Sequence, residues 1–284
     1  MRKDSRTRGH GTKVRHGTRV SCPRAPASRA TLPPQLRRVL PFTGIALFVA
    51  AWQVAVWAAH ATLVPGPFAA LAAIGELAWR GLLLKYIVAS LFRVTWGYFA
   101  ALIVGIPTGV ALGLWRRGEL ALNPFLQILR PISPLAWIPI AILWFGVGDL
   151  SAIFLIFLAS LFPLIVTAMH AVQNIESVHL RAGANFGLSR AQLLRSVIFP
   201  AILPQLVIGM RIALGIAWLV VVAAEMIAVN SGLGFLIIDA RNAGNRYDLV
   251  VAGMMLIGAT GIVLDVVMRR AERLDFVRWG YAEQ

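Results

Sequence analysis

The sequence predicts an all-α polytopic membrane protein with about six transmembrane helices. Hydrophobic residues make up 58% of the 284 residues, and charged residues only 14%. The hydrophobic residues gather in long runs, and about 20 apolar residues are enough to cross a bilayer as a helix. The arginines between the runs are concentrated on alternate connections, which is the pattern of a chain that crosses the membrane repeatedly.

Each run is expected to form a helix, because a helix satisfies its own backbone hydrogen bonds in lipid. The third run is short and contains Pro134 and Pro139, and counting it as a span preserves the alternation of charge. The expected spans are Leu40–Ala59, Val88–Trp115, Pro131–Gly146, Ser151–Val172, Pro204–Val229 and Leu249–Met268.

The net charge of +15 does not indicate a nucleic-acid partner, because its distribution follows the membrane topology. With six spans, one side receives Arg116, Arg117, Arg130, Arg181, Arg190, Arg195, Arg269, Arg270, Arg273 and Arg278. The other side receives only Arg80, Lys85, Arg241 and Arg246. The positive-inside rule then places both termini and the Arg181 connection in the cytoplasm.

Residues 1–38 are expected to form a basic, disordered cytoplasmic tail, followed by a transmembrane domain at 39–275 and a cytoplasmic tail at 276–284. The first tail holds 11 Lys/Arg and one acid, with no apolar stretch long enough for a core. It lacks the features of a signal peptide, and both a transit peptide and a translation start placed too far upstream would account for it. Cys22 is the single cysteine, so no intrachain disulfide is expected.

Small residues recur at every fourth position of the second span. On a helix this spacing forms one stripe, along which another backbone can approach closely. The stripe comprises Gly97, Ala101, Gly105, Gly109 and Gly113. Before this span, Phe68–Tyr86 has an apolar face with charges beside it, which fits either a helix in the membrane interface or a short solvated helix.

Charged residues inside the spans are few, and such residues are functional candidates by default. Arg93 and Glu225 both fall near the outer ends of their spans, where three alternatives are open: an ion pair, separate interfacial positions or contact with a solute. Asp265 and Arg269 are spaced to pair on one helix, and Arg211 can extend to the inner interface.

The connection at 174–203 has the pattern of two short helices joined at a glycine. Gly187 supplies a residue that tolerates the left-handed conformation at a helix end. Ser189 then begins a second helix, with Gln192 completing a capping box. Pro200 and Pro204 are expected to end that helix and begin the fifth span. Such an ordered element is larger than a simple connection requires and suits a rigid lever that docks on a partner.

Several chemistries lack their residues in this sequence. There is no Gly-x-x-x-x-Gly-Lys-Ser/Thr loop, and Lys3, Lys13 and Lys85 are the only lysines, so the chain is not expected to hydrolyse ATP. No Cys/His cluster with metal-ligand spacing is present. We therefore expect no catalytic residue, metal or bound cofactor, and the chain is predicted not to be an enzyme.

The 181–200 segment resembles the coupling loop of ABC-importer permeases, whose pattern is Glu-Ala-Ala, three residues, Gly, nine residues, then Ile-x-Leu-Pro. The corresponding residues are Arg181-Ala182-Gly183, Gly187 and Val197-Ile-Phe-Pro200, with arginine and glycine replacing the first and third residues. Arg130–Gly146, Gly215–Met226 and Ser231–Phe235 resemble signatures of nitrate, taurine and aliphatic-sulfonate permeases. The likeness covers roughly residues 60–275 and implies a type I importer fold.

This resemblance implies a pathway-forming subunit for a small anionic solute, with ATP used by a separate ATPase. Its implied partners are a dimer of ATPase subunits, a second permease copy (as a homodimer), an extracytoplasmic solute-binding protein and the lipid membrane. It also implies a location in the bacterial inner (plasma) membrane. ATPase coupling is assigned to Arg181, Ala182, Gly183, Gly187 and Pro200, and the pathway to Pro134, Pro139, Trp218 and Glu225. The alternative is a self-sufficient ion-coupled transporter, but no inverted repeat is evident and Glu225 is its sole candidate acid.

Overall fold

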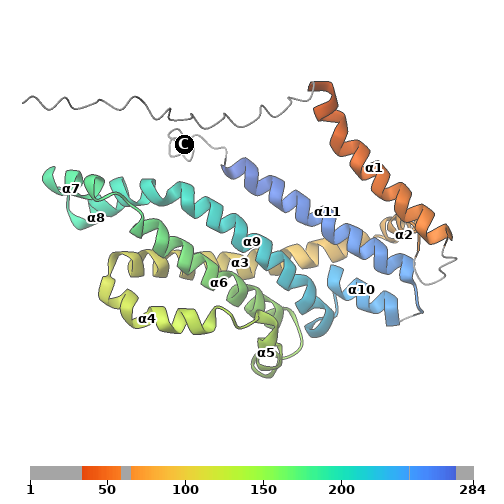
Figure 1. Cartoon of the computed structure of the whole chain (residues 1–284). Helices are drawn as coiled ribbons and strands as arrows, with labels where there is room; N and C mark the ends of the chain where they lie inside the picture. Colours follow the sequence, from red (N-terminus) through yellow and green to blue (C-terminus); the bar gives the residue numbers. More distant parts are fainter. Residues whose placement is uncertain (1–33, 59–64, 243, 273–284) are drawn as a thin grey trace, which may run out of the picture. The chain divides into compact units, whose positions relative to one another are not determined.

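The computed structural model describes residues 34–58, 65–242 and 244–272, so residues 1–33 of the expected tail at 1–38 and the whole expected tail at 276–284 lie outside this range. Residues 34–38 were expected to be disordered but belong to a helix that begins at Pro34. The chain divides between Phe48 and Val49 into two units, and the second contains every element from α2 to α11. All regular elements of the described residues are helical (Figure 1).

The elements before the bundle are α1 (Pro34–Ala58) and α2 (Pro67–Trp79). The apolar part of α1, Thr43–Ala58, is shorter than a full span. The shorter α2 buries Ala70, Ala73 and Leu77 while leaving Phe68 and Leu71 exposed. Its N-terminus carries Pro67, whose missing amide hydrogen is not needed in the first turn of a helix.

Within the described residues, four helices are long and apolar enough to cross a membrane. They are α3 (Leu82–Leu114), α6 (Asp149–Gln173), the helix Arg190–Ala228 that contains α8 and α9, and α11 (Tyr247–Glu272), which is apolar as far as Arg270. A fifth candidate consists of α4 (Arg116–Leu129) and the segment Pro134–Phe145, bent by 85° between them. With α1 these elements account for the six expected spans, although the described apolar part of α1 is short.

The third predicted span contains the irregular backbone that its prolines indicate. A 3₁₀ turn, η1 (Pro134–Trp137), leads into the short helix α5 (Ile138–Phe145). Ser133 caps the 3₁₀ turn by accepting a hydrogen bond from the Leu135 amide. Proline at the start of each element removes a donor where no helical partner exists, so the break carries no unsatisfied amide from those residues.

The stripe of small residues on α3 lies against α6. A side chain added at Gly97 would meet Ile156, one at Gly105 would meet Leu164, and one at Gly113 would meet Val172. Ala101, in the same row, is fully buried. Because the stripe has no long side chains, the two helix backbones approach closely along its length and gain van der Waals contact where lipid offers no hydrophobic driving force.

The fifth span begins differently from the prediction. Pro200 and Pro204 do not end the preceding helix, because α8 (Arg190–Leu193) continues through a π-helical turn, Leu194–Ile198, into α9 (Phe199–Ala228). A π turn widens the helix by one residue and shifts the hydrogen-bond pattern, which provides room for a proline ring. The whole segment from Arg190 to Ala228 is therefore one helix of 39 residues.

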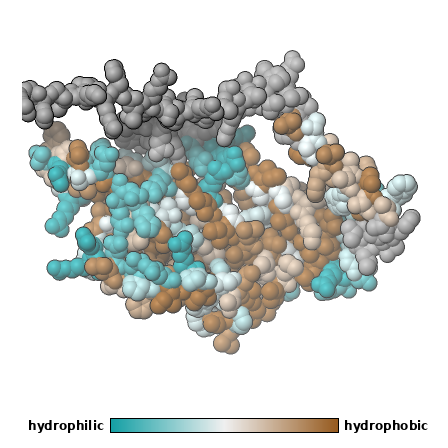
Figure 2. Space-filling view, in the orientation of Figure 1, coloured by the Kyte–Doolittle hydropathy of each residue, from teal (hydrophilic) through white to brown (hydrophobic). Residues whose placement is uncertain are grey.

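The bundle has two ends, named here after the short helices that lie at each. The α10 end holds the starts of α3, α6 and α11, the end of α9, and α10 itself (Leu233–Asn242). The α7 end holds the opposite ends of these helices together with α7 (Ser177–Asn185) and α8. On the face shown in Figure 2, hydrophobic residues cover the middle of the bundle and hydrophilic residues gather over the α7 end.

Candidate functional site

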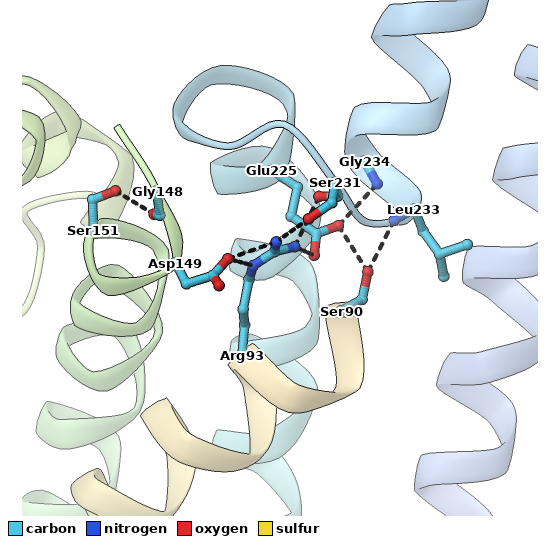
Figure 3. Close-up of polar contacts among 9 residues, drawn as sticks. All are labelled: Ser90, Arg93, Gly148, Asp149, Ser151, Glu225, Ser231, Leu233 and Gly234. Atoms are coloured by element: carbon cyan, nitrogen blue, oxygen red, sulfur yellow. Dashed lines mark hydrogen bonds and ion pairs between the residues drawn. The ribbon is translucent and has the colours of Figure 1, made fainter. Parts of the chain in front are cut away.

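A buried network of polar side chains joins four helices at the α10 end (Figure 3). At its centre the Arg93 guanidinium, on α3, donates from Nη1 to Glu225 Oε1 of α9 at 2.6 Å. Both side chains are almost inaccessible, at 2% and 0% exposure. Of the three alternatives for these residues, the structure shows the ion pair between the second and fifth predicted spans.

The Glu225 carboxylate has further donors that hold the start of α10. The Gly234 amide donates to Oε2 at 2.9 Å, and the Ser90 hydroxyl donates to the same oxygen at 2.8 Å. Ser90 also accepts from the Leu233 amide. The carboxylate thus lies at the N-terminus of α10, where the free amides and the helix dipole favour a negative charge.

Glycine is required where the chain passes around this carboxylate. Gly232 has a φ of 108°, a value that side-chain-bearing residues rarely adopt, and an added side chain there would overlap the Glu225 carboxylate. A side chain at Gly234 would overlap the Val222 carbonyl of α9. The Ser231–Phe235 motif is therefore explained by its close path around one buried acid.

The remaining donors of Arg93 bind the segments on either side. Nε donates to Asp149 Oδ1 of α6 at 2.8 Å, and Nη2 lies 2.7 Å from the same oxygen. Nη1 also donates to the Ser231 carbonyl, and Nη2 to the Ser231 hydroxyl. The guanidinium thus donates four hydrogen bonds and forms ion pairs with two carboxylates, which offsets the cost of its burial.

The other residues assigned to the pathway occupy different environments. Trp218 is buried against α11 and donates its indole N–H to the Ile257 carbonyl. Glu225 is fully buried within the protomer. Pro139 is exposed and Pro134 is half-buried, both on the irregular segment between α4 and α6. These four residues are not brought together into one site.

A second ionic cluster lies toward the α7 end. Arg211 of α9 donates to Asp265 of α11 at 2.7 Å instead of extending alone to the interface, and Glu272 lies 3.4 Å away. Asp265 also binds Arg269 at 2.8 Å, the spacing that the sequence suggested. The Arg211 and Asp265 side chains remain 30% and 40% exposed. This cluster ties α9 to α11 at a partly solvated position.

A third cluster links α2 to the start of α11. Arg246 lies 2.7 Å from Glu76 and 2.8 Å from Asp248. The hydrogen bond from Arg246 lowers the pKa of the Glu76 carboxyl, which therefore stays ionised over a wider pH range than an isolated glutamate. Among residues 34–58, 65–242 and 244–272, no group of acids, histidines or cysteines is arranged to hold a metal ion.

The predicted helix–glycine–helix element is present at the α7 end. Gly187 has a φ of 73° and follows α7, and its amide donates to the Ala184 carbonyl. Ser189 and Gln192 form the reciprocal capping box at the start of α8. Gly183 is buried, and a side chain added there would meet Leu193, so this glycine allows α7 to pack closely on α8.

The outer surface of this element is partly apolar. Arg181, Ala182 and Gly187 are exposed, whereas Pro200 is half-buried in the helix that follows. Phe186, beside the glycine, is 85% exposed, and Val178 is 67% exposed. A large aromatic side chain held outward by a capped, glycine-linked turn is typical of an anchor for another protein. Gly183 lies beneath that surface, not on it.

Sequence reasoning missed four contributors to the two clusters. Ser90, Asp149 and Ser231 were not connected to Arg93, and Arg211 was not connected to Asp265. The available signal was that a charge inside an apolar span requires a partner. Asp149 and Ser231 directly flank predicted spans, and Arg211 and Asp265 lie inside two different spans. Their positions made each of them a candidate partner for a charged residue in another span.

The bundle defines a class of protein: a helical membrane protein with an ordered helix–glycine–helix element at one end. Residues 97–274 match the family model described as "Binding-protein-dependent transport system inner membrane component". That match covers more than half of the chain, and the chain therefore belongs to this family of ABC-importer permeases.

Individual relatives agree with this assignment. The chain is 39% identical over 191 residues to the taurine transport system permease protein TauC of Escherichia coli, covering 66% of this chain and 68% of that protein. It is 35% identical over 249 residues to the putative aliphatic sulfonates transport permease protein SsuC of the same organism, covering 87% and 94%. It is also 35% identical over 242 residues to the bicarbonate transport system permease protein CmpB of Synechococcus elongatus, covering 80% and 85%.

Solved structures support the fold. An inward-facing MetNI methionine ABC transporter chain aligns with a TM-score of 0.61 at 20% identity, covering 69% of this chain and 97% of that chain. The likeness in fold extends over nearly the whole of that chain, and it supports the predicted type I architecture.

Proposed function

We propose that this chain forms the translocation pathway of an ATP-driven importer for a small oxyanion such as a sulfonate, taurine, nitrate or bicarbonate. The observation that carries the proposal is the capped α7–Gly187–α8 element, with Phe186 exposed beside the glycine, in a member of this permease family. The solute class comes from the relatives, whose names include taurine, sulfonate, bicarbonate and nitrate transport.

The α7 end faces the cytoplasm in this proposal, and both termini lie on the same side. The arginines at this end support the orientation, because the connections on the cytoplasmic side of a membrane protein carry an excess of Lys/Arg. All five of the following arginines are exposed and lie on elements that begin or lie at the α7 end, namely α4, α7, α8 and the π turn: Arg116, Arg117, Arg181, Arg190 and Arg195. The α10 end then faces outward, toward a soluble binding protein.

Coupling to a separate ATPase dimer is assigned to the surface around Phe186, Arg181 and Ala182. ATP binds the partner subunits, and this chain contributes no cofactor site. Movement of the docked element reaches the span directly, because α8 continues through the π turn into α9. ATP shifts the access of the pathway only through its different affinities for the two states of the assembly. Gly187 and Pro200 preserve the geometry of this connection, and Gly183 supports it from beneath.

The pathway is proposed to form between two copies of the chain and to be bordered by the irregular Pro134–Pro139 segment. Irregular backbone at membrane depth is tolerated where it is covered by protein or lines a water-filled cavity. Glu225 and Trp218 contribute by fixing the positions of α9, α10 and α11, because both are buried and bonded within one protomer.

Gly187→Asp tests this function in proteoliposomes that contain the permease, its ATPase and its binding protein. We expect the loss of ATP-driven uptake with normal membrane insertion, because aspartate tolerates the φ of 73° better than most residues but places a negative charge on the docking surface. Gly187→Asn is the matched control, because asparagine has nearly the same shape as aspartate and tolerates this φ but adds no charge. Uptake by the permease alone, without ATPase, would instead identify an ion-coupled transporter.

A further inference from the structure

A cavity of about 460 Å³ opens beside the buried network at the α10 end. One part of its wall belongs to the network, through Arg93, Asp149 and Ser231. The rest of the wall comes from α3 and consists of Leu84, Lys85, Val88, Ala89 and Phe92. The cavity therefore combines an apolar side with one buried guanidinium and one exposed ammonium, which is a suitable environment for a small organic or inorganic anion.

Arg93 and Asp149 both line this cavity, and the Nε–Nη2 edge of Arg93 meets only one oxygen of Asp149. Nε and Nη2 form the fork with which arginine binds two oxygens of a carboxylate, sulfonate or similar group. Here both nitrogens bind one oxygen, Asp149 Oδ1, at 2.8 and 2.7 Å. Asp149 Oδ2 has no hydrogen-bond partner among the described residues. A planar or tetrahedral oxyanion would satisfy the same fork with two oxygens.

The two carboxylates bound to Arg93 differ in how readily they could leave. Glu225 is fully buried and accepts from Ser90, Arg93 and Gly234, so its departure would leave an uncompensated charge inside the protein. The Asp149 side chain is 57% exposed, and Arg93 is its single side-chain partner within the part of the chain that the structure describes. Water can therefore solvate the aspartate once it is displaced.

The backbone before Asp149 is also of a kind that permits displacement. Gly146 has a φ of 75° and Gly148 a φ of 159°, and a side chain added at either would meet nothing within 4 Å. Glycine is therefore present at both positions for its backbone freedom and not for close packing. One hydrogen bond, from the Gly148 amide to the Ala228 carbonyl, and another from the Ser151 hydroxyl to the Gly148 carbonyl hold the turn.

We propose that the Nε–Nη2 edge of Arg93 is a binding subsite for the transported oxyanion, which Asp149 occupies when the subsite is empty of solute. The anion displaces the aspartate, takes both N–H groups of the fork, and gains the field of Lys85, which makes no ion pair among the described residues. One negative charge replaces another at the guanidinium, so the Arg93–Glu225 pair stays neutral throughout. The identity of the anion rests on the proposed function; the fork and its displaceable aspartate do not.

Removing an ordinary ligand-binding residue weakens binding. Removing the Asp149 carboxylate should instead strengthen the binding of the anion, because this carboxylate competes for Arg93. The full chain in lipid nanodiscs, without ATPase or binding protein, would be titrated with ethanesulfonate and followed by saturation-transfer NMR of the ligand. Asp149→Asn should lower the apparent Kd by roughly tenfold, since the competing occupant no longer reduces the fraction of binding-competent protein. Lys85→Met should raise the Kd several-fold, and nitrate and bicarbonate should compete at the same site.

Asp248→Asn is the matched control, because it makes the same change in the first turn of another membrane helix at the α10 end, where the acid binds Arg246 instead. It should leave the Kd unchanged. An equal gain in affinity from Asp248→Asn, no gain from Asp149→Asn, or no binding by any variant would overturn the proposal. The titration uses no ATP, so a permease that binds the anion but fails in ATP-driven uptake would refute the proposed function and leave the subsite standing.

Discussion

Arg93 and Arg211 are both arginines of long apolar helices that pair with an acid from another helix, yet their surroundings differ. Arg93 is 2% exposed and Glu225 is 0% exposed, whereas Arg211 and Asp265 are 30% and 40% exposed. In a buried site, losing one partner leaves a charge that neither water nor protein compensates. At the partly solvated site, water replaces a lost partner at little cost. The Arg93–Glu225 pair is therefore expected to matter strongly for the stability of the bundle, and the Arg211–Asp265 pair only weakly.

Glu225→Ala would test the difference most strongly. We expect it to destabilise the protein by about 3–5 kcal/mol, because Arg93 and the amides at the start of α10 lose their buried acceptor. Urea unfolding in detergent micelles, followed by Trp fluorescence, measures this loss. The double variant Arg93→Met/Glu225→Met should recover part of it, since an apolar pair leaves no buried charge. An unchanged unfolding midpoint for Glu225→Ala would show that the network does not hold the α10 end together.

Gly234→Ala would sharpen the comparison by perturbing the Glu225 site without removing a charge. The added methyl group would overlap the Val222 carbonyl and approach Glu225 Cβ at 2.9 Å. We expect a loss of roughly 1–3 kcal/mol from overpacking, measured in the same unfolding experiment. Gly215→Ala is the matched control, because its added methyl group meets nothing within 4 Å and alanine is the better helix former. Equal effects of the two changes would contradict the close path of residues 231–234 around the carboxylate.

Asp265→Asn should have the smallest effect of the three. It removes the charge that pairs with Arg211 and Arg269, but all three side chains keep access to water. Any loss in the unfolding midpoint should disappear at about 1 M salt, where charges are screened beyond about 3 Å. The loss caused by Glu225→Ala should persist at that salt concentration. A salt-resistant loss from Asp265→Asn would place the two pairs in the same class.

Much of the local structure could be predicted from the sequence, because its causes are local. The stripe from Gly97 to Gly113 identifies a packing face by its spacing alone, and the Ser189–Gln192 capping box is present as predicted. The prediction that Pro200 ends a helix was wrong, because a π turn that no short-range pattern indicates accommodates the ring. A local sequence pattern indicates which conformation a segment prefers. It does not show how a helix can change its hydrogen bonding to include an unfavourable residue.

The partners of the charged residues were harder to predict, because they depend on how distant segments pack. Arg211 and Asp265 are 54 residues apart, and Ser90 is 143 residues from the Leu233 amide that it binds. The position of Arg93 inside an apolar span indicated that it needs a partner, and Glu225 was a candidate because it lies in another span. The same position gave no reason to add Asp149, which lies just outside a span and becomes a partner only once α6 begins beside α3.

The unbroken helix from Arg190 to Ala228 has a mechanical consequence. At 1.5 Å per residue, its 39 residues extend for roughly 58 Å, with the capping box at one end and Glu225 close to the other. A rod of this length converts a tilt of about 5° at its base into a displacement of roughly 5 Å at its tip. The π turn lies near the base and is the natural point of compliance. The same helix that begins beside Ser189 thus carries the acid that organises the far end of the protein.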